Sequence, residues 1–235
     1  MLSAMTGIRV IFFDAAGTLI GLPKGVAFHY CEVASRHGLH LSHEVMKEAF
    51  RATWREMPAP TTTRVRREDD DKNWWRRVVG RVLEKCGMAA DAKLDRDALF
   101  EELYVEFARP GVWELFPDVR AALARLAPEY ELGIISNFDR RLRVVLSELG
   151  VAPLFRHVVI SSEVGADKPD PWIFQEALRV AGVRASEALH VGDEPASDWE
   201  GAANAGLQVF RLKRPRTTLT HLVESLSAKS KSSAI

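Results

Sequence analysis

The chain has 235 residues, of which 47% are hydrophobic and 27% are charged. This composition supports a large buried core and excludes disorder or a fibrous repeat for most of the length. The 32 basic and 32 acidic residues give a formal net charge of zero. Such a balance provides no general attraction to nucleic acid or to an anionic membrane, so we expect neither as a partner.

Two further features indicate the compartment. The N-terminal stretch MLSAMTGIRVIFFD lacks the charged start and long apolar run of a secretory signal, and no segment is a long uninterrupted apolar run. Cys31 and Cys86 lack CxxC spacing, so we expect reduced packing residues rather than a disulfide or a zinc site. The sequence therefore predicts a cytoplasmic protein.

In chain order, the first predicted element is a buried strand over residues 8–13, an apolar run that ends in Asp14 and a Gly17-Thr18 turn. The following part of the chain has no comparable strand. It has apolar residues at helical spacing instead, with Ser42 placed as a helix N-cap. The helical stretches are residues 27–37, 42–56, 73–86 and 95–108. We therefore predict an inserted helical cap domain over residues 22–110.

Two features of this insert have alternative interpretations. The connector TTTRVRREDDDKN carries three arginines beside four acids, which favours a solvated loop over a site for an anionic substrate. Trp54, Trp74 and Trp75 lie in helical stretches, where core packing is favoured over substrate contact.

The rest of the chain alternates between strand and helix patterns. Apolar runs predict strands at residues 131–135, 157–160, 188–191 and 207–212, and helical patterns cover residues 118–126, 140–149, 172–180 and 198–205. This alternation predicts an α/β core, a doubly wound, Rossmann-like parallel sheet whose ligands bind beyond the carboxyl ends of the strands. We assign residues 1–21 and 111–235 to this core and expect residues 225–235 to be a frayed tail.

Polar residues at the predicted strand ends, together with one loop, describe a phosphoryl-transfer site. They are Asp14, Ser136-Asn137, Lys168 in the loop after the third strand, and Gly192-Asp193 with Asp198. One carboxylate can attack phosphorus and a second can hold Mg²⁺, which oxygen-only ligands favour over zinc. A hydroxyl, a backbone N–H and an ammonium group can neutralise the phosphoryl oxygens.

Each of these side chains also has a purely structural interpretation. Asp14 and Asp193 could cap turns, Ser136 could be an ordinary strand-end hydroxyl, Lys168 an exposed loop lysine, and Asp198 the N-cap of the helix that follows it.

With these motifs, the chain resembles the haloacid dehalogenase-like hydrolase superfamily. The four motifs stand in the order of that family: Asp14-Ala15-Ala16-Gly17-Thr18, Ile135-Ser136-Asn137, Lys168-Pro169-Asp170-Pro171, and Val191-Gly192-Asp193 with Asp198 five residues later. The resemblance spans almost the whole chain. A cap between the first two motifs is the class I arrangement of the family, and the strings ISNFDRRL and KPDPWIFQEAL resemble the rhythmically-expressed-gene-two-like branch.

The resemblance implies a role for each matching residue. Asp14 would be the nucleophile that forms an aspartyl-phosphate, Lys168 would clamp nucleophile and phosphate, and Ser136 and the Asn137 backbone N–H would bind phosphate. Mg²⁺ would be bound by Asp14, Asp193 and the backbone carbonyl of Ala16. Asp198 would orient Lys168 or a metal-bound water, and Glu194 is a candidate for a similar supporting contact.

Ala16 is the one departure from the phosphatase pattern, because the family has its second acid at this position. General acid–base help of that kind is typically worth about 10² to 10⁴ in rate. We predict a Mg²⁺-dependent phosphatase acting on a small phosphorylated metabolite. A catalytically weak or inactive binding or regulatory protein is the main alternative.

Two lesser alternatives come from relatives that also lack this acid. A dehalogenase would cleave a carbon–halogen bond. Relatives of that kind lack the Gly-Asp pair of the fourth motif, so the presence of Gly192-Asp193 argues against this alternative. A phosphonatase would cleave a carbon–phosphorus bond with a cap lysine as Schiff base. The cap lysines are Lys24, Lys47, Lys72, Lys85 and Lys93, and we expect each of them at the surface. Neither the substrate nor the oligomeric state is predicted by the sequence.

Overall fold

The structure is a computed structural model that describes residues 7–88 and 94–232. The chain forms two compact units. Unit 1 contains the described residues up to Gly21, the segment Thr61–Arg67 and the described residues from Leu115 onward. Unit 2 contains Leu22–Pro60 and the described residues of Glu68–Glu114. Segment Thr61–Arg67 therefore belongs to unit 1, although the chain on both sides of it belongs to unit 2.

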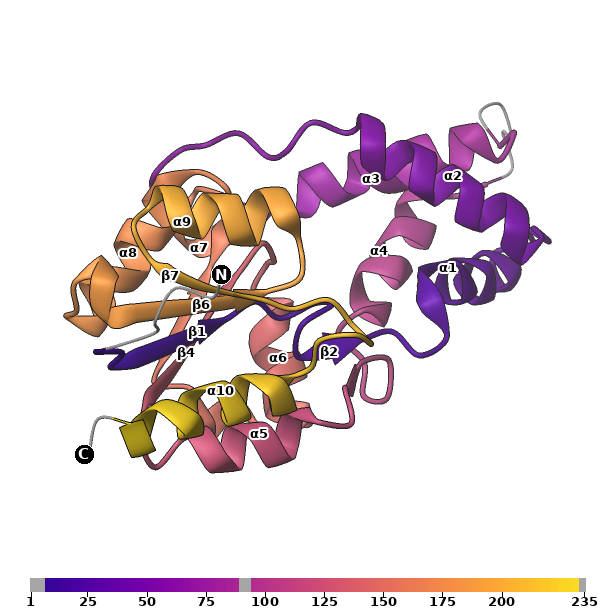
Figure 1. Cartoon of the computed structure of the whole chain (residues 1–235). Helices are drawn as coiled ribbons and strands as arrows, with labels where there is room; N and C mark the ends of the chain where they lie inside the picture. Colours follow the sequence, from indigo (N-terminus) through magenta and orange to yellow (C-terminus); the bar gives the residue numbers. More distant parts are fainter. Residues whose placement is uncertain (1–6, 89–93, 233–235) are drawn as a thin grey trace. The chain divides into compact units, whose positions relative to one another are not determined.

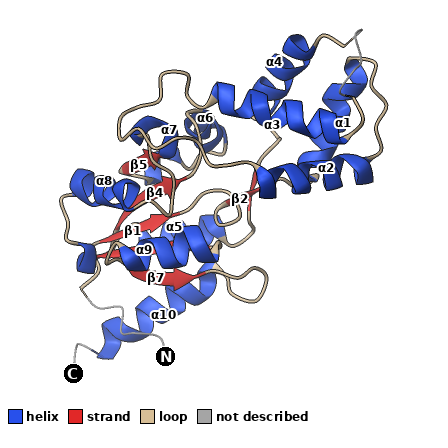
Figure 2. Cartoon of the chain, turned by 90° about the horizontal axis from the view of Figure 1, so that it is seen from above, coloured by secondary structure: helices blue, strands red, loops and turns tan. Residues whose placement is uncertain are grey.

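Unit 1 is built on a parallel five-stranded sheet, in which apolar runs form the buried strands. The strands are β1 (Val10–Phe13), β4 (Glu131–Ser136), β5 (His157–Ile160), β6 (Ala188–Gly192) and β7 (Gln208–Arg211). They lie in the order β5-β4-β1-β6-β7, with neighbouring strands parallel, and Figure 2 shows β5, β4, β1 and β7 in this succession. All four residues of β1 are fully buried. The predicted α/β parallel-sheet fold is confirmed.

Helices cover both faces of this sheet. In Figure 1, α8 (Pro171–Ala181) and α9 (Gly201–Asn204) lie on one face, and α5 (Val119–Leu126) and α10 (Leu219–Ser232) on the other. Phe12, Phe174 and Ala202 are members of the apolar cluster between the sheet and α8 and α9. The other helical elements of unit 1 are α6 (Arg141–Glu148), α7 (Ser161–Val164), the 3₁₀ turns η1 (Ala152–Leu154) and η2 (Ala185–Glu187), and the π-helical turn η3 (Pro195–Glu200).

Two sequence predictions need correction, and two short strands were not predicted. The helix expected over residues 198–205 divides into η3 and α9, and Asp198 lies inside η3, so it is not a helix N-cap. The tail expected from residue 225 is helical in α10 as far as Ser232, while residues 233–235 lie outside the described part. The short strands β2 (Ile20–Gly21) and β3 (Glu114–Leu115), which pair with each other, were not predicted.

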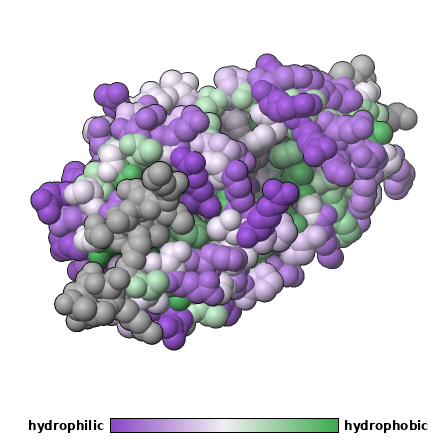
Figure 3. Space-filling view, viewed as in Figure 1, coloured by the Kyte–Doolittle hydropathy of each residue, from purple (hydrophilic) through white to green (hydrophobic). Residues whose placement is uncertain are grey.

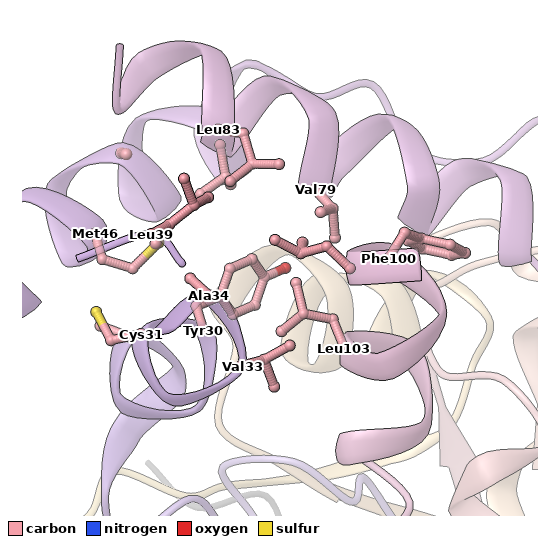
Figure 4. Close-up of a cluster of buried hydrophobic side chains, with 14 of the residues drawn as sticks. Tyr30, Cys31, Val33, Ala34, Leu39, Met46, Val79, Leu83, Phe100 and Leu103 are labelled. Atoms are coloured by element: carbon pink, nitrogen blue, oxygen red, sulfur yellow. The ribbon is translucent and has the colours of Figure 1, made fainter. Parts of the chain in front are cut away.

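Unit 2 consists of four helices around its own apolar core. The helices are α1 (Gly25–Arg36), α2 (His43–Glu56), α3 (Lys72–Lys85) and α4 (Arg96–Glu106). Ser42 is the predicted N-cap of α2, and its hydroxyl accepts a hydrogen bond of 3.2 Å from the Val45 amide. Figure 4 shows Tyr30, Met46 and Leu83 among the side chains that gather inside this core. The four predicted helical stretches are therefore present.

Several side chains of the insert test the sequence interpretation. Cys31 is buried and Cys86 half-buried, and both are free thiols as predicted. Trp74 and Trp75 pack against the core of unit 2, but Trp54 is 53% exposed, so core packing was wrong for Trp54. Arg67 is buried, so the solvated-loop prediction was wrong for this residue.

The visible face of the surface is mainly hydrophilic. Hydrophilic residues cover most of the face shown in Figure 3, and hydrophobic residues appear there as separate small areas. No helix among the described residues is long and apolar enough to cross a bilayer.

Candidate active site

The strand register brings the predicted site residues to one edge of the sheet. Phe13 pairs with Ile134 of β4 and with Val191 of β6, so Asp14 lies one residue beyond the end of β1, between the ends of its two neighbours. The Asp14 amide donates to the Val191 carbonyl over 2.8 Å, which continues the strand pairing to the site itself. Because the strands are parallel, their carboxyl ends meet at this edge.

Asp14 is at the centre of the cluster. Its side chain is 10% exposed, and its Oδ1 accepts a hydrogen bond of 2.7 Å from the Lys168 ammonium. The Ser136 hydroxyl lies 3.4 Å from the same oxygen and donates to it. The nucleophile candidate therefore has two of its predicted partners in direct contact.

Lys168 is held at both ends. Its Nζ donates to Asp14 and, over 2.6 Å, to Oδ1 of Asp198. At the backbone, the Lys168 amide donates to Asn137 Oδ1 over 2.7 Å, and Asn137 Nδ2 donates to the Lys168 carbonyl over 2.9 Å. The side chain of Asn137 thus fixes the lysine loop, a role that the sequence did not indicate.

Two glycines allow the carboxylates to approach the backbone closely. Gly17 has a φ of +92°, and a Cβ there would lie 2.4 Å from Asp193 Oδ2. A Cβ on Gly192 would lie 2.2 Å from Asp198 Cγ. The Thr18 hydroxyl donates to Asp193 Oδ1 over 2.9 Å and so orients that carboxylate. Any larger residue at either glycine position would collide with a site carboxylate.

The three carboxylates strongly influence one another. Asp14, Asp193 and Asp198 each present one oxygen within 4.8 Å of the others. Burial raises the pKa of Asp14 to about 7, against the opposing effect of Lys168 and with a contribution from Asp198. Burial likewise raises the pKa of Asp193. Burial is the largest cause of both shifts and the neighbouring carboxylates add to it, so the cluster disfavours a full negative charge on each of these two groups.

Asp198 and Lys168 form a buried ion pair of 2.6 Å. Burial opposes the charge on each, yet the Lys168 ammonium and the His190 hydrogen bond hold the pKa of Asp198 below its usual range. Asp14 and Asp198 in turn raise the pKa of Lys168. Asp198 Oδ1 accepts from Lys168 and from His190 Nε2 over 2.9 Å, and Oδ2 accepts from the Glu194 amide over 3.0 Å. Both Asp198 oxygens are therefore engaged within the protein.

Comparison with known proteins agrees with this geometry. A family model for haloacid dehalogenase-like hydrolases matches residues 8–206. The chain belongs to the haloacid dehalogenase-like hydrolase family. It is 33% identical to haloacid dehalogenase-like hydrolase domain-containing protein 3 of Danio rerio, over 92% of this chain and 89% of that protein. It is 28% identical to the Rhythmically expressed gene 2 protein of Drosophila melanogaster, over 86% of this chain and 82% of that protein.

One relative of this hydrolase has a named substrate class, and solved structures share the fold. Glyceraldehyde 3-phosphate phosphatase of Methanopyrus kandleri is 40% identical over 57% of each chain. The HAD-hydrolase YfnB of Bacillus subtilis, bound to magnesium, has a TM-score of 0.70 at 18% identity, covering 87% of this chain and 88% of that one. The defluorinating L-2-haloacid dehalogenase Rha0230 has a TM-score of 0.74 at 23% identity, covering 92% and 86%.

The remaining predicted residues lie at the margin of the cluster. Ala16 is exposed and lies two residues after the buried Asp14. Because this residue is alanine, the position of the second acid of the family has no carboxyl group. The Glu194 side chain is exposed, although burial of part of it and the adjacent Asp193 raise its pKa. Lys24, Lys47 and Lys85 are exposed, Lys72 is half-buried in an ion pair with Glu101, and Lys93 lies outside the described residues.

Besides the side-chain role of Asn137, sequence reasoning missed the contributions of Thr18 and His190 to the site. Thr18 belongs to the first motif but was treated only as part of a turn, although it holds Asp193. His190 is a polar residue inside the otherwise apolar strand β6, where it is fully buried. A histidine in such a run was the available signal, because a fully buried polar side chain requires a partner.

Proposed function

We propose that this hydrolase is a Mg²⁺-dependent phosphatase that forms an aspartyl-phosphate on Asp14 and acts on a small phosphorylated metabolite. The observation that carries the proposal is the Lys168 ammonium 2.7 Å from the Asp14 carboxylate, in one cluster with Asp193. A nucleophilic carboxylate, a cation for the phosphoryl oxygens and a second carboxylate are the parts that such a reaction needs. The similarity to a glyceraldehyde 3-phosphate phosphatase supports the substrate class.

The proposed reaction has two halves. An Asp14 oxygen attacks phosphorus, the bond from phosphorus to the ester oxygen breaks, and the alcohol leaves after taking a proton. Lys168, the Ser136 hydroxyl and the Asn137 backbone N–H neutralise the phosphoryl oxygens during this transfer. Water then attacks the aspartyl-phosphate, which releases inorganic phosphate and restores the Asp14 carboxylate. Ala16 supplies no proton to the leaving alcohol, so the proton comes from solvent or from a group outside the family pattern.

The donor set fits the Mg²⁺ that the family implies. Asp14 and Asp193 present oxygens within 4.8 Å of each other. Burial raises both of their pKa values, so a cation between them would favour the charged carboxylates. Both oxygens of Asp198 already accept hydrogen bonds from this chain. We therefore assign the ion to Asp14, Asp193 and the Ala16 carbonyl, and assign Asp198 to orienting Lys168. When bound, Mg²⁺ would withdraw electron density from the phosphoryl group.

One observation favours a second candidate function. Ala16 leaves the leaving-group side of Asp14 without an acid, while the phosphate and cation residues remain assembled. A protein that binds phosphorylated ligands with little turnover fits this arrangement too. A dehalogenase is less well supported, because Asp193 is part of the cluster and the similarity to dehalogenase structures of low identity concerns the fold alone.

The test is turnover of a panel of phosphate esters with Mg²⁺ and with a chelator, together with Asp14→Asn. We expect release of inorganic phosphate that needs Mg²⁺, is lost in Asp14→Asn, and passes through an acid-stable phosphoryl adduct on Asp14 detectable by mass spectrometry. Binding of beryllofluoride without turnover would favour the binding protein. Release of halide from 2-chloropropionate without Mg²⁺ would contradict the proposal. That the helical insert over residues 22–110 closes over the site as a cap stays a prediction, which hydrogen exchange with and without Mg²⁺ and beryllofluoride would test.

A further inference from the structure

Segment Thr61–Arg67 docks on the part of unit 1 that precedes Lys168. The amides of Thr63 and Arg64 donate to the Gly165 carbonyl over 2.7 Å and 3.1 Å, and the Arg67 amide donates to the Ser162 carbonyl over 2.9 Å. These bonds join two stretches about a hundred residues apart in the chain. The first six residues of the segment are exposed. Thr62 and Thr63 add two long hydroxyl contacts, to Asp170 at 3.4 Å and to the Gly165 carbonyl at 3.5 Å, so Arg67 is the buried side chain of this attachment.

Gly165 makes the close approach of this segment possible. It ends α7 with a φ of +71°, and a Cβ at this position would lie 2.0 Å from the Val65 carbonyl oxygen. No side chain fits in that space. The fit between the turn after α7 and the segment is therefore specific to glycine.

Arg67 provides the buried anchor of the segment. Its Nη2 donates to Asp167 Oδ2, and its Nε donates to the Thr61 carbonyl over 3.3 Å. The two side chains of the ion pair are only 7% and 12% exposed. In such a pair each charge depends on the other, because removal of one partner leaves the second charge buried without compensation. The ion pair thus ties the Asp167 side chain to segment Thr61–Arg67.

Asp167 is the residue immediately before Lys168. Asn137 holds the Lys168 backbone from the other side, through bonds of 2.7 Å and 2.9 Å. The loop is therefore fixed on both flanks, while Lys168 Nζ reaches Asp14 and Asp198 at 2.7 Å and 2.6 Å. Contacts this short tolerate little displacement, since a shift of about 1 Å in a catalytic group can reduce the rate by about 10²-fold.

We infer that Arg67, from within the inserted part of the chain, is a positioning residue for Lys168: through Asp167 it fixes the loop that holds the ammonium group against Asp14. The kinetic part of this inference rests on the proposed phosphatase function. The structural part, the order of the loop, does not.

The experiment is a double-mutant cycle of Arg67→Met and Asp167→Asn, with Arg66→Met as the matched control, since Arg66 is the exposed arginine beside Arg67. Using p-nitrophenyl phosphate, we expect each single variant to lower kcat by about tenfold to a hundredfold. KM should change less than about threefold, because the loss falls on the transition state. The kcat of the double variant should be no lower than that of the less active single variant, since the two side chains act as one unit. Arg66→Met should match the wild type.

A second readout does not depend on turnover. Hydrogen exchange of the peptide over residues 165–168 should become faster in Arg67→Met and in Asp167→Asn, and stay unchanged in Arg66→Met. Absence of wild-type turnover, with faster exchange in both variants, would overturn the proposed function and support the positioning role. Unchanged exchange and unchanged kcat would overturn the positioning role.

Direct binding of substrate by Arg67 would give a different pattern. In that case Arg67→Met would raise KM with kcat unchanged, Asp167→Asn would keep the wild-type kcat, and the inference would be wrong. If Arg67→Met does not fold, Arg67→Lys carries the test. It keeps the charge but loses the planar fork of guanidinium donors, so its kcat should lie between those of the wild type and of Asp167→Asn.

Discussion

His190 tests whether a hydrogen bond to Asp198 from strand β6 contributes to the site. It lies fully buried in β6, and its Nε2 donates to Asp198 Oδ1 over 2.9 Å, the oxygen that also accepts from Lys168. Burial lowers the pKa of His190, so the ring is neutral, and the carboxylate partner fixes the hydrogen on Nε2. The residue therefore orients Asp198 without adding a charge to the site.

His190→Phe removes this donor and keeps a ring of similar size next to Phe174. The ring centroids of His190 and Phe174 are 5.5 Å apart, and the angle between the ring planes is 87°. The lost hydrogen bond to a charged group is worth about 1.5–3 kcal/mol. The substitution also removes the buried His190 Nδ1, which has no hydrogen-bond partner, and whose burial costs about 1–3 kcal/mol. These two contributions oppose each other, so we expect the free energy of unfolding to stay within about 2 kcal/mol of the wild-type value.

Catalysis should respond more strongly than stability. If the activation free energy rises by the whole free energy of the lost hydrogen bond, kcat falls about tenfold to a hundredfold, because each 1.36 kcal/mol is a factor of about ten. The assay is kcat and KM on p-nitrophenyl phosphate, with urea unfolding in parallel. His157→Phe is the control: His157 lies in β5, bonds to Glu131 over 2.9 Å through Nε2, and contacts none of the site residues described above. Equal losses of kcat in both variants, or no loss in a folded His190→Phe, would refute the reasoning.

Three further predictions concern the carboxylates and their neighbours. Ala16→Asp should raise kcat/KM for alkyl phosphates by up to about 10² to 10⁴ and change p-nitrophenyl phosphate little, because only a poor leaving group needs the proton; equal values in the two proteins would show that another group supplies it. Gly17→Ala should abolish Mg²⁺-dependent binding of beryllofluoride in calorimetry, since its Cβ would collide with Asp193. Without divalent cation, the free energy of unfolding should fall as the pH rises from 3.8, the ordinary pKa of an aspartate and so that of Asp14 in the unfolded chain, to about 7, its pKa in the folded chain. Between these two values only the folded chain keeps the proton on Asp14. Asp14→Asn should flatten this part of a pH series of urea unfolding curves, and an unchanged slope would contradict the assignment.

The strands were predictable because this sheet is buried on both faces. Its strands are short apolar runs that stop at polar residues, and the run over residues 157–160 coincides with β5. Helices of unit 2 were predictable from apolar spacing and from the Ser42 cap. The division of residues 198–205 into η3 and α9 was not, because hydrophobic periodicity does not distinguish an α-helix from a π-helical turn.

The supporting contacts of the site could not be read from sequence for a different reason. Thr18 and Asp193 are 175 residues apart, and Arg67 and Asp167 are 100 residues apart. Nothing in the local sequence of the connector distinguishes Arg67 from Arg64 or Arg66. Arg67 is the arginine that becomes buried because segment Thr61–Arg67 is hydrogen-bonded to the turn at Gly165 in the folded chain.

The charge balance of the site leads to one more prediction. Three carboxylates share one ammonium group from Lys168 in the cluster, and Asp14 responds with a pKa of about 7. In the proposed reaction Asp14 attacks phosphorus as a carboxylate, so a cation that binds Asp14 also has to displace its proton. Binding of Mg²⁺ should therefore release protons near neutral pH and release fewer as the pH rises above the Asp14 pKa. Calorimetric titration of Mg²⁺ at pH 6.5 and pH 8.5, each in two buffers with different ionisation enthalpies, measures this release directly. Heats that do not depend on the buffer at pH 6.5 would mean that Asp14 is already ionised there, and that Lys168 rather than the metal ion maintains the nucleophile.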